Sequence, residues 1–207
     1  MPNLLSDPVV RLANRSDNAV STLTLAAAFD SDPVTRFCMR TDSRRDWAMR
    51  TGFKRVLELY RPYDLTFVVN DGAGVALWAR HDQWQLTFWK EVALIPTYIR
   101  ACGIRRFMRL NRGFEVMKLY HPTEPHYYLH LLGVHPSHQS QGLGAALLCA
   151  MLERCDREQM PAYLEATHPR NISIYQQHGF QIIKEFSFGA GGPSLAAMWR
   201  KPRQTIK

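Results

Sequence analysis

The chain has 207 residues, of which 46% are hydrophobic and 21% charged, and its formal net charge at neutral pH is +8. This length and composition fit one globular domain and argue against widespread disorder. A basic chain can attract nucleic acid, an anionic surface or a phosphorylated small molecule, but its Lys and Arg residues never run longer than a pair. We interpret the charge as a solvated basic surface and expect no nucleic-acid partner.

The sequence predicts neither a membrane span nor an export signal. Residues 143–152 are almost wholly apolar, but this run is about half the length that crosses a bilayer, so it predicts a buried helix. The first fifteen residues include Asp7 and lack a long apolar stretch after a basic start, unlike a secretory signal. We therefore expect a cytoplasmic protein that does not associate with membranes.

The four cysteines are spaced too irregularly for a metal or redox motif. No close Cys-x-x-Cys pair occurs, so we expect buried, reduced thiols and no metal site. Cys149 and Cys155 share one apolar helical stretch, where cysteine usually acts as a small core residue.

Taken in chain order, the first 80 residues indicate an α/β opening. Apolar patterning, together with the Ser31-Asp32-Pro33 and Asp71-Gly72 breaks, separates the segments. The expected elements are a strand over 9–12, a helix over 19–29, a helix over 47–59, and a hairpin of 65–70 with 75–80.

From Leu86 to about Lys118 the pattern is helical, with interruptions at Pro96 and Gly103 that predict two or three helices. Its arginines form either a phosphate-binding face or, as we favour, the solvated side of an amphipathic helix. These arginines are Arg105, Arg106, Arg109 and Arg112, and the expected apolar side includes Phe107, Met108 and Phe114.

The second half predicts a strand, a glycine-containing loop and a helix, followed by more alternating elements. Residues 127–134 are aromatic and aliphatic, as in a strand, and Pro136 ends the run. After the loop, Gly144, Leu147, Leu148, Met151, Leu152 and Cys155 recur at helical spacing. The remaining expected elements are a strand over 162–166, a helix from about Asn171, and strands over 180–188 and 195–200.

Gly142 and Gly144 lie where a strand has ended and a helix begins. The first turn of a helix offers unpaired backbone N–H groups and the positive end of the helix dipole, and glycine allows a phosphate to approach closely. A tight turn alone would also explain the glycines. A Walker loop would need Lys-Ser or Lys-Thr where Ala145-Ala146 stands, and a Rossmann fingerprint would need glycine at Gln139.

The remaining pattern, Gln139-x-x-Gly142-x-Gly144, resembles the pyrophosphate-binding signature of the GNAT N-acetyltransferase superfamily. Further segments match that family in order and spacing: Leu132-Gly-Val-His-Pro136, Glu165-Ala-Thr, and Asn171-x-x-x-Tyr175-x-x-x-Gly179-Phe180. Within the superfamily, residues 121–202 are most similar to the branch containing puromycin N-acetyltransferase. The N-terminal half resembles it only in its order of elements and in residues such as Asp32-Pro33 and Leu77-Trp78.

The resemblance implies a fold and a binding site for acetyl-coenzyme A (acetyl-CoA). The fold is a single α/β domain over 1–207, with a mixed, centrally splayed sheet flanked by helices, an acceptor-side half over about 1–120 and a CoA-binding half over about 121–202. Between the fourth and fifth strands, the backbone of Leu132 and Val134 would pair with the pantetheine arm. Asn171 would contact the cofactor, or serve as the N-cap of its helix. The backbone amides expected to hold the pyrophosphate are those of Gln139, Ser140, Gln141, Gly142, Leu143 and Gly144.

An amide-forming acyl transfer needs a deprotonated amine and a proton for the departing thiolate. By resemblance, Tyr175 gives that proton to the CoA sulfur; otherwise it is a packing residue. The base is less marked, because strand alternation places Tyr128, His130 and Leu132 on one face unless a bulge shifts the register. His130 would then face the acceptor, and arylalkylamine N-acetyltransferases carry a histidine at a similar place.

Glu165, near the end of the fifth strand, is a second candidate base. It would otherwise position the amine or be an exposed strand-end carboxylate. Weaker candidates are His121, Glu124 and His135, and a water chain would replace any dedicated base.

The resulting hypothesis is acetyl transfer from acetyl-CoA to a primary amine of a small molecule, such as an amino-nucleoside, by direct attack in a ternary complex. The chain would act without a metal, as a monomer or homodimer. The alternatives are a protein or peptide N-acetyltransferase and a catalytically silent CoA-binding regulator.

Overall fold

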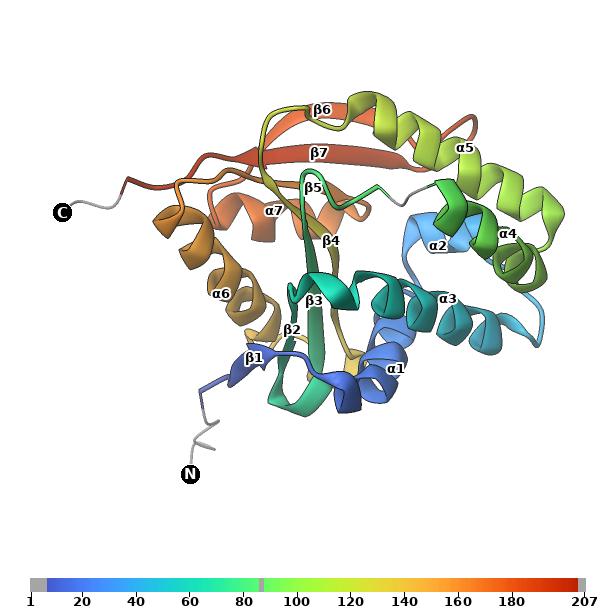
Figure 1. The fold of residues 1–207 in the computed structure, drawn as a ribbon, viewed down its shortest axis with the longest axis horizontal. Helices are drawn as coiled ribbons and strands as arrows, with labels where there is room; N and C mark the ends of the chain where they lie inside the picture. The colour runs from blue at the N-terminus through green and yellow to red at the C-terminus, as the bar shows by residue number, and fades with distance from the viewer. Residues whose placement is uncertain (1–6, 86–87, 205–207) are drawn as a thin grey trace.

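The protein is described by a computed structural model that covers residues 7–85 and 88–204. Figure 1 shows a sheet with helices on both faces. The strands are β1 (Val10–Leu12), β2 (Thr66–Val69), β3 (Gly74–Arg80), β4 (Tyr127–Val134), β5 (Ala162–Ala166), β6 (Gln181–Ser187) and β7 (Ser194–Arg200). The α-helices are α1 (Asn18–Ala28), α2 (Pro33–Cys38), α3 (Arg45–Tyr60), α4 (Phe88–Cys102), α5 (Ile104–Tyr120), α6 (Leu143–Arg157) and α7 (Pro169–Gln177), with 3₁₀ turns η1 (Arg15–Asp17), η2 (Arg61–Tyr63), η3 (Asn70–Gly72) and η4 (Pro136–His138).

Within the described residues the strands form one seven-stranded sheet in the order β1-β2-β3-β4-β5-β7-β6. All neighbours are antiparallel except β4 and β5, which are parallel. The connection between these two strands is α6, as a parallel pair requires a crossover. The predicted mixed α/β sheet flanked by helices is therefore confirmed.

Two irregularities interrupt the regular pairing at the centre of the sheet. The register of β3 against β4 shifts, because Leu77 is opposite Leu131 whereas Trp78 is opposite Leu129. His130 is the extra residue of this β-bulge. In addition, the pairing of β4 with β5 stops at Leu129 and Leu164. Beyond these residues the two strands separate, which is the predicted central splay.

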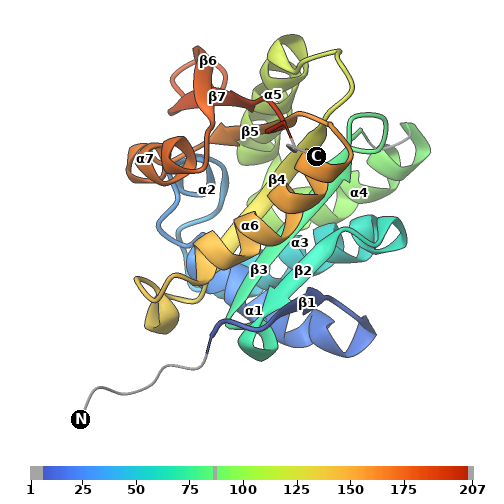
Figure 2. The same ribbon diagram turned by 90° about the vertical axis from the view of Figure 1, so that its left-hand side faces the viewer.

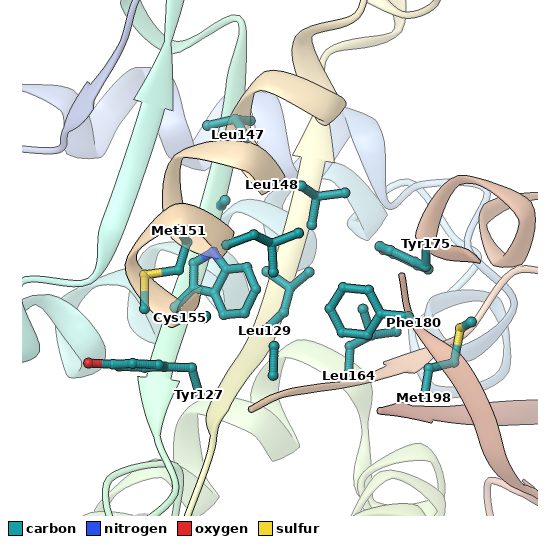
Figure 3. Packing of buried hydrophobic residues seen from close by; sticks show 14 of the residues in the cluster. Tyr127, Leu129, Leu147, Leu148, Met151, Cys155, Leu164, Tyr175, Phe180 and Met198 are labelled. Atoms are coloured by element: carbon teal, nitrogen blue, oxygen red, sulfur yellow. The ribbon is translucent and has the colours of Figure 1, made fainter. Parts of the chain in front are cut away.

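The helices cover the two faces of the sheet separately. Figure 2 shows α6 in front of β2, β3 and β4, with α1 and α3 behind them. The main core lies under α6, where Leu147, Leu148, Met151 and Cys155 pack against buried residues of β4, β5 and β7 (Figure 3). On the other face, residues of α1 and α3 pack on the alternate side chains of β2 and β3.

The apolar face predicted for the helix at 104–120 is wrong for Met108 and Phe114, whereas Phe107 is half-buried. Met108 and Phe114 are 46% and 39% exposed, whereas Leu110, Val116 and Met117 pack against a buried cluster. The rotation of α5 follows from a close approach at Gly113, where a Cβ atom would lie 2.1 Å from the Phe188 ring.

Other predictions differ from the structure in detail. The helical stretch after 80 forms two helices broken at Gly103, with Pro96 inside α4, and its predicted start at Leu86 lies outside the described residues. Helix α2 was not predicted; it begins at Pro33 because the Asp32 carboxylate caps the Thr35 N–H at 2.9 Å. Cys149 lies on the solvent side of α6, so the prediction that it is a core residue is wrong.

Candidate active site

The loop between β4 and α6 provides a concentration of unpaired backbone donors. Ser140 and Gly142 have positive φ angles of 61° and 78°, and Gly142 is the N-cap of α6 without a side-chain cap. The Gln139 side chain donates to the Val134 carbonyl at 3.1 Å and ties the loop to the strand end. Backbone amides in such alternating turns, followed by a helix N-terminus, form a concavity suited to an anion.

Asn171 is the third residue of α7 and lies two positions beyond its first, Pro169. The N-cap is His168, whose Nδ1 accepts from the Arg170 N–H at 3.2 Å. The alternative that Asn171 is the N-cap is therefore wrong. Its half-buried side chain lies in the first turn of the helix.

Tyr175 lies on the α6 side of the sheet, as a member of the main core, and is 8% exposed. Its ring packs edge-on against Phe180 with centroids 6.0 Å apart (Figure 3). Burial raises the pKa of the hydroxyl, and the nearby Asp32 carboxylate raises it further. Tyr175 therefore keeps its proton at neutral pH and is able to donate it.

His130 and Glu165 lie at the start of the splay, each one residue beyond the last β4–β5 pair. The side chains of Leu164 and Ala166 join the main core under α6, so Glu165 faces the opposite side of the sheet together with Tyr163. His130 stacks on Tyr60 of α3, on that same side, with ring centroids 4.9 Å apart.

The bulge corrects the predicted face of β4. Tyr128 and His130 share the face that α3 covers, as their edge-on ring contact at 5.5 Å shows. Leu132 and Val134, however, pack against the main core under α6. The grouping of Leu132 with His130 is therefore wrong, because the extra residue reverses the alternation.

His130 is an uncharged imidazole in this setting. Burial lowers its pKa to about 4, with a smaller contribution from the charge of His121. Its Nδ1 atom is buried and has no hydrogen-bond partner among the described residues. A ligand or water is needed to satisfy this atom.

Glu165 is enclosed by ring side chains. Its side chain is 2% exposed, and Oε1 is 3.6 Å from Nδ1 of His121. Burial and then the Glu165 charge raise the pKa values of the Tyr128 and Tyr163 hydroxyls. The alternative that Glu165 is an exposed strand-end carboxylate is therefore wrong.

The weaker base candidates separate in the structure. His121 is buried and contacts Glu165, whereas Glu124 is exposed. His135 caps η4, because its Nδ1 atom accepts from the Ser137 N–H at 3.4 Å. His126, which the sequence reading did not single out, is 1% exposed and lies against His121. Two histidines five residues apart, just before a predicted strand, are the only local signal for it.

Asp32 is a second residue whose position in the site was not foreseen. Beyond capping α2, its other carboxylate oxygen accepts a hydrogen bond from the Thr167 hydroxyl, just after β5. This contact joins the two halves of the chain beside Tyr175. The Asp32-Pro33 pair is the signal, because an N-cap carboxylate followed by proline begins a helix.

Comparisons with known proteins agree with this architecture. Residues 106–180 match the model of the acetyltransferase (GNAT) family. A Corynebacterium glutamicum protein described as histone acetyltransferase HPA2 and related acetyltransferase superposes with a TM-score of 0.70 and 23% identity, over 98% of this chain and 100% of that one. The chain has the GNAT acetyltransferase fold.

Two further similarities agree with this fold. An uncharacterised N-acetyltransferase of Schizosaccharomyces pombe is 25% identical over 174 residues, which cover 79% of this chain and 70% of the relative. Arylalkylamine N-acetyltransferase 2 from Aedes aegypti superposes with a TM-score of 0.61 and 13% identity, over 96% of this chain and 100% of that one. The closer likeness to the puromycin N-acetyltransferase branch stays a prediction.

Members of the GNAT family use acetyl-CoA, and the residues present fit that molecule. The loop from Gln139 to Gly144 carries the positive-φ turns and the helix N-terminus without a side-chain cap that a diphosphate needs. Among the described residues, β4 beyond Leu129 has no strand partner on its β5 side. Across residues 7–85 and 88–204, no group of three His, Cys, Asp or Glu side chains is arranged to hold a metal ion. None of the helices in those residues is long and apolar enough to span a membrane.

Proposed function

We propose that this chain transfers an acetyl group from acetyl-CoA to a primary amine of a small molecule, by direct attack of the amine in a ternary complex. The observation that carries the proposal is the splay of β4 from β5. It places the glycine loop and Tyr175 on the α6 side, and His130 and Glu165 on the other side. An acyl donor and an amine would approach each other through this opening from opposite faces.

The proposed binding roles follow from the donors at the opening. Backbone amides from Gln139 to Gly144, those of Ser140, Gln141 and Leu143 included, hold the diphosphate. The backbone of Leu132 and Val134 pairs with the pantetheine arm, and Asn171 contacts the cofactor at the start of α7. Acetyl-CoA supplies the acyl group as a thioester, an activated donor.

Tyr175 is proposed as the acid. Its raised pKa, caused first by burial, keeps the hydroxyl protonated at neutral pH. Within the described residues its hydroxyl makes no hydrogen bond, so its proton is available for the departing thiolate. Asp32 lies near enough to influence that hydroxyl and holds the α2 end of the site against Thr167.

Glu165 is proposed as the principal base and His130 as a neutral neighbour. A carboxylate attracts an alkylammonium and accepts its proton, whereas an imidazole with a pKa near 4 is a weak acceptor at neutral pH. Replacing Glu165 with Gln should lower kcat by about 10²–10⁴-fold and displace the acidic limb of the pH–rate profile, with a smaller effect of His130→Ala. If both profiles match the wild type while substrate binds normally, deprotonation occurs elsewhere.

The small-molecule acceptor is supported by the elements that cover the acceptor side. The face that His130 and Glu165 share is enclosed by α3 and by the segment around Trp84, whose carbonyl accepts from the Tyr60 hydroxyl at 2.6 Å. The Aedes aegypti arylalkylamine enzyme shares the fold. A covered, aromatic-lined site suits a compact amine better than an extended chain.

The test is a panel of small amines and peptides, assayed for free thiol released from acetyl-CoA by the full chain. Turnover of small amines with mass-confirmed N-acetyl products is the expected result. Turnover of peptides alone would favour the runner-up, a protein N-acetyltransferase, as the name of the Corynebacterium glutamicum protein suggests. CoA binding without turnover of any amine would indicate a silent regulator.

A further inference from the structure

Behind Glu165 lies a histidine that is as deeply buried as the carboxylate itself. Nδ1 of His121 and Oε1 of Glu165 are 3.6 Å apart, and their side chains are 3% and 2% exposed. Neither atom has a hydrogen-bond partner among the described residues. Buried polar atoms are normally hydrogen-bonded, so this facing pair marks a place where a proton would join the two side chains.

The hydrogen bonds of His126 decide which nitrogen of His121 faces Glu165. His126 Nδ1 is 2.6 Å from the backbone oxygen of Glu124, which can only accept, so this nitrogen carries a hydrogen. Burial lowers the pKa of His126 to about 4, so the ring is neutral near pH 7 and its Nε2 is an acceptor. That Nε2 is 3.1 Å from Nε2 of His121, which must therefore be the donor.

It follows that a neutral His121 presents a bare lone pair to Glu165. With its hydrogen on Nε2, the Nδ1 atom of His121 is an acceptor, and the ionised Glu165 oxygen is also an acceptor. Two acceptors at this distance repel each other, and one added proton converts the repulsion into a charge-assisted contact. The geometry thus creates a place for a single proton.

We propose that His121 and Glu165 act as one proton-accepting unit, in which the proton removed from the acceptor amine is shared between Oε1 of Glu165 and Nδ1 of His121. This inference rests on the proposed function and adds His121 to it as a positioning and proton-sharing residue. In the transfer, an N–H bond of the ammonium breaks and the nitrogen keeps the electron pair. The proton bonds to the unit and is later lost to water.

Aromatic rings enclose the imidazole of His121 and fix its place beside Glu165. Trp84 stacks on the ring with centroids 3.8 Å apart, and Tyr128 and Tyr163 contact it edge-on at 4.9 and 4.8 Å. An indole face attracts an imidazolium, and the three rings hold the orientation of the imidazole. The other titratable groups toward this ring are His126 and His130, both with lowered pKa values and hence neutral, and the two tyrosine hydroxyls.

His121 also borders an open pocket. A pocket with a volume of about 310 Å³ is lined by His121 together with His81, Asp82, Trp84 and Lys118. Asp82 and Lys118 are the fully charged groups at this opening, and they carry opposite signs.

The first test measures protonation directly, in the full chain without acetyl-CoA or amine. Imidazole ¹⁵N and carboxyl ¹³C resonances are followed against pH in the wild type and in Glu165→Gln. Nε2 of His121 should keep its hydrogen throughout, while Nδ1 of His121 and the Glu165 carboxyl carbon titrate in one joint step. In Glu165→Gln, the Nδ1 step should move to lower pH by about one unit or more. Separate steps in the wild type, or an unmoved Nδ1 step in the variant, would overturn the proposal.

The second test uses the pH–rate profile of His121→Gln, with His81→Gln as the matched control because His81 lines the same pocket but has no contact with Glu165. His121→Gln should move the acidic limb of kcat/KM to lower pH and reduce kcat near neutral pH by about 10–10²-fold, with an unchanged KM for the amine. In His81→Gln, the acidic limb of kcat/KM should stay at its wild-type pH.

The two tests separate failure of this inference from failure of the proposed function. If Glu165→Gln moves the acidic limb of the pH–rate profile but His121→Gln does not, the shared proton is refuted and Glu165 acts alone. If the wild type acetylates no amine, the proposed function fails, and the resonance titration still decides whether His121 and Glu165 bind one proton together.

Discussion

Removal of one oxygen atom from Tyr175 should separate turnover from stability. The Tyr175 ring packs in the main core against Phe180, and Tyr175→Phe keeps this packing. Because the hydroxyl makes no hydrogen bond within the described residues, the free energy of unfolding should change by no more than about 0.5 kcal/mol. If the hydroxyl protonates the leaving thiolate, kcat should fall by about 10²–10⁴-fold, which corresponds to about 3–5 kcal/mol in the barrier.

Tyr127→Phe is the matched control, in which stability should fall while turnover is kept. Its hydroxyl donates to the Glu158 carboxylate at 2.5 Å, at the far end of β4 from the splay. Loss of this bond should lower the free energy of unfolding by about 1–2 kcal/mol and leave kcat unchanged.

The assay pairs urea denaturation with thiol release at saturating amine, and calorimetry supplies the CoA affinity. Wild-type turnover by Tyr175→Phe would refute the reasoning and make Tyr175 a packing residue. A large loss of CoA affinity would also refute it, because the hydroxyl would then bind the cofactor instead of acting as an acid.

Three further expectations follow from the structure. Gly144→Glu should weaken CoA binding by at least tenfold in calorimetry, because the new side chain places bulk and negative charge at the diphosphate loop. Gly144→Ala should bind CoA normally, because its Cβ atom would lie 3.8 Å from Val134, an ordinary contact distance. Asp156→Ala should lower the free energy of unfolding by about 3–5 kcal/mol, because the buried Arg200 guanidinium donates two 2.8 Å hydrogen bonds to Asp156 and would lose its carboxylate partner. An equal loss in Asp46→Ala, which breaks an exposed ion pair, would contradict this. The Arg200 hydrogen bond lowers the pKa of Asp156. The ion pair therefore stabilises the fold fully above the unfolded carboxyl pKa of about 3.9, and this stabilisation is lost as the pH falls through the lower pKa of the folded state. Unfolding curves measured from pH 6 to pH 2 would detect the loss.

The sequence alone indicated the parts of the CoA side, because those signals are local. The strand over 127–134, the glycines at 142 and 144, and the apolar periodicity of α6 each depend on residues close in the chain. The resulting strand, loop and helix occur within a residue or two of their predicted bounds. Tyr175 and Glu165 could be named because the segments around them resemble those of the GNAT superfamily.

The tertiary structure decided which side chains meet on the acceptor side, because contacts between distant segments leave no local pattern. Pairing with β3 creates the bulge at His130 and turns Leu132 to the other face, and contact with Phe188 at Gly113 sets the rotation of α5. The approach of His121 to Glu165 depends on the parallel pairing of β4 with β5. Neighbouring residues determine propensity and periodicity, but burial and ionisation depend on the atoms that the whole fold brings around a group.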